Sequence, residues 1–122
     1  MKLGITVWQN RISPLLDSAY TIMIVNINNG NMEEAVFEKI DSVDPFERVH
    51  KIAELGIDEL ICGAVSRYFY DLIAERGIKI IPFISGDVNV VLEDYLSGKS
   101  LNITHPMPGC GRRIRCRRRG RK

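Results

Sequence analysis

The order of strand-like and helix-like segments constrains the fold of this chain more than any other feature. Residues 2–8 place Leu, Ile and Val at every second position, the period that is typical of a β-strand. Residues 20–27 are apolar on both sides, so this second strand is expected inside a sheet that is covered on both faces. A third strand is expected over residues 32–38, after an Asn-Asn-Gly-Asn turn whose residues tolerate a positive φ. The first part of the chain therefore predicts one strand followed by an antiparallel hairpin.

The pattern changes to that of helices near residue 44. Three expected helices each begin at a capping residue and end at a glycine: Asp44 to Gly56, Ser66 to Gly77 and Asp87 to Gly98. Short apolar strands separate them, at residues 59–63 and 78–83. Strands that alternate with helices in this way pair in parallel through crossover connections. We therefore predict an α/β protein with a three-layer fold, in which a mixed five-stranded sheet carries helices on both faces.

Charge divides the chain into two parts. Its length of 122 residues suits a single domain. All 15 acidic residues precede Pro106, whereas 8 of the 17 basic residues lie between Arg112 and Lys122. A block of like charge cannot join a packed core, so it must face water, an anion or a partner. We expect an α/β domain over residues 1–104 and a basic, cysteine-containing flexible tail over residues 105–122.

Ligands of such sheets usually bind beyond the carboxyl ends of the parallel strands. The segments expected there supply five candidate site residues, Arg11, Ser13, Cys62, Gly63 and Ser66. Ser66 would begin a helix whose free N–H groups favour an anion, with no carboxylate in its own segment to compete. Each residue also has a purely structural interpretation, with Ser66 as a helix cap and Cys62 as a small buried hydrophobic residue.

The tail contains three soft or borderline metal ligands, His105, Cys110 and Cys116. The neighbouring arginines would favour the thiolate form of the cysteines, which suits a metal or a sulfide-rich anionic cluster. The C-x5-C spacing matches no zinc or ferredoxin motif, so further ligands would have to come from elsewhere. A solvated tail that aids solubility or binds nucleic acid nonspecifically explains the arginines equally well.

The sequence offers no convincing catalytic set. Two-metal nuclease chemistry would need a carboxylate on the first strand, and that strand has none. Neither a Walker loop nor a G-x-G-x-x-G, G-x-S-x-G or H-E-x-x-H motif occurs, and the two histidines, His50 and His105, are far apart in the sequence. No apolar run is long enough to span a bilayer, and the first residues do not resemble a signal peptide. We expect a cytoplasmic protein that is not an enzyme.

Several segments together resemble the dinitrogenase iron-molybdenum cofactor biosynthesis family. They are Ile12-Ser13-Pro14-Leu15-Leu16-Asp17-Ser18-Ala19, Cys62-Gly63-Ala64-Val65-Ser66, Gly77-Ile78-Lys79-Ile80 and Tyr95-Leu96-Ser97-Gly98-Lys99. The resemblance spans residues 1–99, and the segment Pro108-Gly109-Cys110-Gly111 is similar to the glycine-, cysteine- and arginine-rich ends of some members. It implies a ribonuclease H-like fold and a role as an accessory protein that binds or carries cofactor and cluster precursors.

Together, the residues and the resemblance predict a non-enzymatic carrier of an anionic metal-sulfur cluster. The cluster would be an iron-molybdenum cofactor precursor or a related iron-sulfur unit, and the partners would be the proteins that donate and receive it. The cluster would lie near Arg11, Cys62 and Ser66, with Cys110 and Cys116 as mobile thiolate ligands. The alternative is a binding module whose arginine-rich tail docks on nucleic acid or on an acidic protein.

Overall fold

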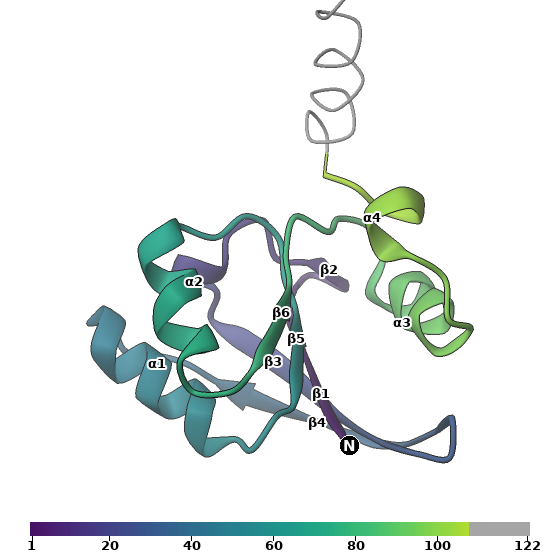
Figure 1. Cartoon of the computed structure of the whole chain (residues 1–122), viewed down its shortest axis with the longest axis horizontal. Coiled ribbons are helices and arrows are strands. Elements are labelled where there is room, and N and C mark those ends of the chain that lie inside the picture. The colour runs from purple at the N-terminus through teal and green to yellow at the C-terminus, as the bar shows by residue number, and fades with distance from the viewer. Residues whose placement is uncertain (108–122) are drawn as a thin grey trace, which may run out of the picture.

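The computed structural model describes residues 1–107, which form one α/β domain (Figure 1). The strands are β1 (Lys2–Trp8), β2 (Arg11–Ile12), β3 (Thr21–Asn28), β4 (Asn31–Lys39), β5 (Glu59–Ile61) and β6 (Lys79–Ile81). The helices are α1 (Pro45–Glu54), α2 (Arg67–Ala74), α3 (Val88–Leu96) and α4 (Leu101–Thr104), with a 3-10 turn, η1, at Leu16–Ser18.

The sheet has the mixed topology that the sequence predicts. Its strand order is β4-β3-β1-β5-β6, and β2 adds a short antiparallel pairing to the end of β1. The β1, β5 and β6 strands are parallel, while β3 and β4 form the antiparallel hairpin. The five main strands are those expected, and the two-residue β2 is too short to produce a periodic pattern.

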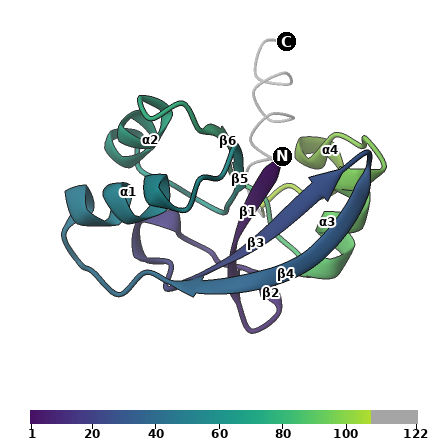
Figure 2. The same ribbon diagram turned by 90° about the horizontal axis from the view of Figure 1, so that it is seen from below.

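Helices cover both faces of the sheet, so the protein has three layers (Figure 2). The α1 and α2 helices pack on one face, where Ile22, Leu60 and Ile73 belong to one buried cluster. The α3 and α4 helices pack on the other face, where Leu3 and Val91 belong to a second cluster. Because the central strands β3 and β5 contribute side chains to both clusters, they are apolar on each side, as the sequence indicates.

The expected capping and turn residues act as predicted. Asp44 Oδ1 accepts a hydrogen bond of 3.0 Å from Phe46 N, and Asp87 Oδ1 accepts one of 2.9 Å from Asn89 N. Asn29 and Gly30 adopt φ values of 54° and 79° in the β3–β4 turn. Local chemistry thus fixes the helix starts and the hairpin register.

Residues 105–107 belong with the folded domain, which corrects the boundary expected after residue 104. Ser85 N donates to His105 O at 3.0 Å, and Met107 N donates to Phe83 O at 3.0 Å. Ser85 Oγ also donates to Pro106 O at 3.0 Å. These contacts join residues far apart in the sequence, which local patterns cannot reveal. Within the described part of the chain, no helix is long and apolar enough to cross a membrane.

Candidate functional site

The segments that follow the three parallel strands meet at one end of the sheet, which we call the carboxyl edge (residues 8–15, 62–66 and 82–87). Hydrogen bonds tie them together: Ile12 N donates to Gly86 O at 2.9 Å, and Phe83 N donates to Gly63 O at 2.8 Å. Ala64 N donates to Pro14 O at 2.8 Å. The expected convergence of these segments is therefore present, and the side chains that they expose decide what can bind there.

Gly63 allows the first two segments to approach each other. A Cβ at this position would lie 2.4 Å from Ser13 O and 2.6 Å from Pro14 O, which is closer than atoms can pack. Gly63 itself is buried. Its contribution to the carboxyl edge is thus the absence of a side chain, and it presents its own carbonyl to Phe83.

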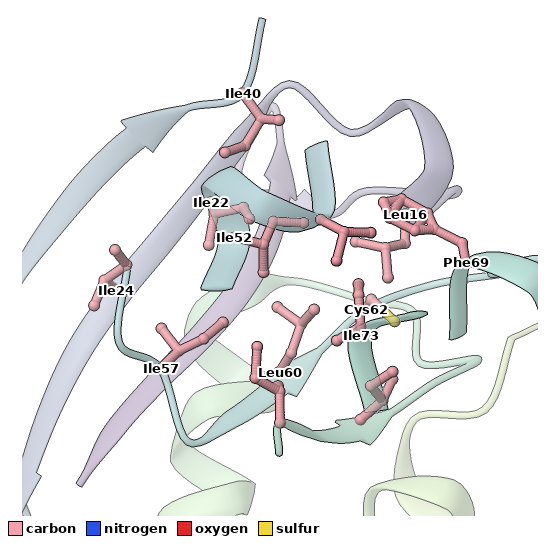
Figure 3. Close-up of a cluster of buried hydrophobic side chains, with 13 residues drawn as sticks. Leu16, Ile22, Ile24, Ile40, Ile52, Ile57, Leu60, Cys62, Phe69 and Ile73 are labelled. Atoms are coloured by element: carbon pink, nitrogen blue, oxygen red, sulfur yellow. The ribbon is translucent and has the colours of Figure 1, made fainter. Parts of the chain in front are cut away.

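Cys62 lies in the hydrophobic core rather than at an open site. Its side chain is completely buried and belongs to the cluster under α1 and α2, with Leu16, Phe69 and Ile73 (Figure 3). Burial raises the pKa of the Cys62 thiol to about 12, and the nearby Asp17 carboxylate acts in the same direction. A neutral, enclosed thiol cannot ligate a metal, so we remove Cys62 from the candidate ligands.

In the native protein, Cys62 should therefore not react with thiol reagents. Its buried thiol should also make the stability of the protein fall at alkaline pH. Because the folded state favours the neutral thiol, this contribution to stability is intact below pH 9 and is lost as the pH rises toward 12. In a Cys110→Ser/Cys116→Ser background, Cys62 is the one remaining thiol. We expect it to react with a thiol reagent only at the rate of unfolding, as stopped-flow labelling would measure. Rapid labelling at pH 8 without unfolding would contradict its buried position.

Ser66 begins α2 as expected, but the anion position at this helix start is already occupied by Asp17. Ser66 N donates to Asp17 Oδ1 at 2.9 Å, and Ser66 Oγ donates to Asp17 Oδ2 at 2.6 Å. Ser66 Oγ also accepts a hydrogen bond of 3.2 Å from Phe69 N. The expectation of an anion site free of competing carboxylates is wrong, because Asp17 arrives from η1, 49 residues away in the sequence.

Arg11 lies on β2, and Ser13 directly follows this strand. Arg11 is exposed in β2 and forms an isolated antiparallel bridge with Asp87, so its charge lies beside a carboxylate-bearing segment. Ser13 is buried and donates its N–H to Thr6 O at 2.9 Å. The five residues chosen from the sequence thus share the carboxyl edge, but they do not present their side chains to one common ligand.

His105 is held by an acidic residue of α3. Its Nε2 lies 2.6 Å from Asp94 Oδ2, and both side chains are largely buried. The hydrogen bond with His105 lowers the pKa of Asp94, and Lys99 lowers it further. Among residues 1–107, no three metal-ligating side chains gather into a site. Cys110 and Cys116 lie outside the described residues.

A hollow at the carboxyl edge is lined by residues that were not among the five candidates. It has a volume of about 390 Å³ and is lined by Val65, Arg67, Tyr70, Asp71, Pro82 and Phe83. We call it the Phe83 hollow. Phe83 adopts a φ of 61°, which is strained for a bulky side chain and is often found at functional positions. Its carbonyl also anchors Met107. An exposed arginine and apolar walls therefore adjoin the point where the described chain ends.

Comparison with a family model shows which protein family the chain belongs to. The model described as "Dinitrogenase iron-molybdenum cofactor" matches residues 1–98. The chain belongs to this family. Membership confirms the resemblance inferred from the sequence and assigns the domain to the type associated with the iron-molybdenum cofactor of dinitrogenase. No curated protein matches the sequence.

Solved structures share the fold at low sequence identity. The structure of the protein PH0822 superposes with a TM-score of 0.76 at 14% sequence identity, and the match covers 81% of this chain and 93% of PH0822. A proposed dinitrogenase from Methanocaldococcus jannaschii gives a TM-score of 0.67 at 19% identity, over 81% and 90% of the two chains. The apo form of the orange protein from Desulfovibrio gigas gives 0.65 at 16% identity, over 88% and 92%. These similarities confirm that the chain has the same fold as these solved structures.

Proposed function

We propose that the protein is a non-enzymatic carrier of an anionic metal-sulfur cluster, held between the Phe83 hollow and the thiolates of Cys110 and Cys116. The cluster is cargo that passes from a donor protein to a recipient. Family membership supports the class of cargo. The position of the hollow, and the burial of Cys62, change the site from the one expected around Arg11, Cys62 and Ser66.

The observation that carries this proposal is the anchoring of Met107 at the carboxyl edge. Met107 N donates to Phe83 O, and residues 105 and 106 pair with residues 84 and 85. Cys110 follows Met107 by three residues, so covalent geometry keeps its Cα within about 11 Å of the Met107 Cα. Three residues of chain are therefore enough for the first tail thiol to reach the Phe83 hollow, as the proposal requires. Cys116 is six residues further on and has a wider reach.

Basic residues of α2 and of the tail sequence suit an anionic cargo. Arg67 is exposed on the first turn of α2 and lines the hollow, while Asp71 lines it one turn later. The eight basic residues between Arg112 and Lys122 follow Cys110. Guanidinium groups donate hydrogen bonds to sulfide and offset the negative charge of a thiolate-bound cluster. Within the described residues, the hollow itself holds one arginine and one aspartate, so the positive charge that would favour an anion over a bare divalent cation comes from the tail sequence.

Changing both tail cysteines to serine should remove cargo without loosening the fold. The described core is built from residues between Leu3 and Leu101, so Cys110→Ser/Cys116→Ser should change the free energy of unfolding by no more than about 0.5 kcal/mol. Anaerobic reconstitution with iron, sulfide and molybdate, followed by metal analysis and visible absorption, should show loss of most of the bound metal. Cys62→Ser is the matched control. It should cost about 1 to 3 kcal/mol of stability, because it buries a hydroxyl, yet retain metal.

Arg67 should contribute to retention of the cluster, whereas Arg76, near the other end of α2, should not. Arg67→Gln removes a charge at the hollow, whereas Arg76→Gln removes an exposed charge just beyond the other end of α2. We expect the first change to weaken cluster retention several-fold and the second to leave it unchanged, measured by metal content after gel filtration. Equal effects of the two changes would contradict the assignment of the hollow. A metal-free wild-type protein under all reconstitution conditions would contradict the carrier proposal itself.

A further inference from the structure

A second hollow at the carboxyl edge is surrounded by three exposed aromatic rings. It has a volume of about 500 Å³ and shares no lining residue with the Phe83 hollow. Trp8, Tyr20 and Phe37 line it with exposed fractions of 57%, 53% and 61%. We call it the aromatic hollow. Three half-exposed rings around one concavity are an unusual surface for a free protein, because each ring leaves a large apolar area in water.

The walls between the rings carry amide and hydroxyl groups. The remaining lining residues are Val7, Gln9, Asn10, Ser13, Ser18 and Thr21. Gln9 and Asn10 adopt left-handed φ values of 52° and 64° in the turn between β1 and β2, which costs energy for residues that carry a Cβ. Amides and hydroxyls both donate and accept hydrogen bonds, as the edges of nucleobases require. The hollow therefore combines stacking surfaces with groups that match base edges.

Cations flank the rings. Lys39 Nζ lies 5.9 Å from the centroid of the Tyr20 ring. Arg11 is the register partner of Trp8 in the β1–β2 pairing, so the two residues lie directly opposite each other. Neither cation belongs to a salt bridge in the described part of the chain. The sequence also supplies eight basic residues between Arg112 and Lys122.

We infer that the aromatic hollow binds a single-stranded nucleic acid, with bases stacked on Trp8, Tyr20 and Phe37 and phosphates near Arg11 and Lys39. Aromatic stacking combined with flanking basic residues is the common device of proteins that bind single strands. A duplex keeps its bases stacked on each other and would leave the rings unused. A neutral sugar or an apolar peptide would use the rings but not the cations. The inference is independent of the proposed carrier function, since the two hollows are separate.

Trp8 provides a direct test because it is the only tryptophan in the chain. Ten-nucleotide oligouridylate and oligodeoxyuridylate should quench its fluorescence on binding to the full-length protein, and comparison of the two, which differ in the sugar alone, would show whether the sugar matters. Inorganic polyphosphate is the essential control, since it carries the charge without bases. It should compete for the basic residues but leave Trp8 fluorescence nearly unchanged. Equal quenching by polyphosphate, or no quenching by either oligonucleotide, would overturn the inference.

A matched pair of exposed phenylalanines separates stacking from general hydrophobicity. Phe37 and Phe46 are 61% and 62% exposed, but only Phe37 lines the aromatic hollow. Phe37→Ala should weaken binding of a labelled oligouridylate about tenfold in fluorescence anisotropy, as expected for the loss of one stacked base, whereas Phe46→Ala should have no effect. Tyr20→Ala is a second variant on the hollow and should weaken binding similarly. Metal retention should be unchanged in all three, and equal binding by the Phe37 and Phe46 variants would contradict the site.

Discussion

Gly63→Ala is expected to destabilise the protein by about 3 kcal/mol or more, because the new methyl group would meet backbone rather than flexible side chains. The added Cβ would lie 2.4 Å from Ser13 O and 2.9 Å from the carbonyl carbon of Pro14. That segment cannot easily move away, since Ser13 N donates to Thr6 O and Leu16 N donates to Ala64 O at 2.8 Å. Urea unfolding followed by circular dichroism would measure the loss.

Gly77→Ala is the matched control for this change. Gly77 ends the second helix with a φ of 82° and has no heavy atom within 4 Å of an added Cβ. Its substitution should cost about 1 kcal/mol, through the backbone conformation alone. If the two variants were equally stable, the close approach at the carboxyl edge would not be tight. A Gly63→Ala protein that does fold should also show a displaced Phe83, because Gly63 O holds Phe83 N.

The sheet and its helices could be predicted because their signals are local. Strand periodicity, the capping residues Asp44, Ser66 and Asp87, and the Asn29-Gly30 turn each act within a few residues of their position. Right-handed crossovers then leave few ways to arrange the elements. The short β2 strand and the four-residue α4 helix escaped prediction because neither is long enough to show a period.

The candidate site was harder to predict because its contacts are long-range. Asp17 accepts hydrogen bonds from Ser66 at a distance of 49 residues in the sequence, so its carboxylate could not be counted against an anion site at Ser66. Cys62 was counted among the cofactor-binding candidates, but it follows Leu60 by two residues and faces the same buried cluster, which agrees with its purely structural interpretation as a small buried residue. Alternation along β5 could have revealed this orientation. Nothing in the sequence indicated that Phe83 would adopt a positive φ and anchor residue 107.

In the first helix, sequence periodicity predicts only some of the side chains that are buried. Hydrophobic spacing predicts that Phe46, Val49, Ile52 and Ala53 face the core. Val49 and Ile52 are buried, but Phe46 is exposed and packs edge-on against Tyr68 at a centroid distance of 6.2 Å. Arg48 is buried instead. A periodicity argument counts arginine as polar, so it cannot show that carbonyl groups around η1 and just before the helix accept hydrogen bonds from this buried side chain.

Arg48 joins the η1 turn to the segment before the first helix. Its Nη2 donates to Leu16 O at 3.1 Å and to Ala19 O at 2.5 Å, and its Nη1 donates to Ser42 O at 3.0 Å and Ile40 O at 3.3 Å. Burial lowers the pKa of Arg48, and the Asp17 charge opposes this shift. The planar guanidinium can serve four carbonyls at once, which a lysine ammonium cannot. Arg48 therefore also supports Asp17, and through it the start of the second helix.

Arg48→Met should cost about 3 kcal/mol or more of unfolding free energy, because it leaves buried carbonyl groups without donors. Arg48→Lys keeps the charge but lacks the several N–H donors of the planar guanidinium. It should therefore recover less than half of the unfolding free energy that Arg48→Met loses. Lys51→Met is the control on the same helix, where an exposed ion pair with Asp41 at 2.7 Å should contribute far less to stability than the buried guanidinium of Arg48. Thermal and urea unfolding of the three variants would rank them. A wild-type-like Arg48→Met protein would mean that water or neighbouring groups satisfy the carbonyls of Leu16 and Ala19, and that the guanidinium does not hold the η1 turn in place.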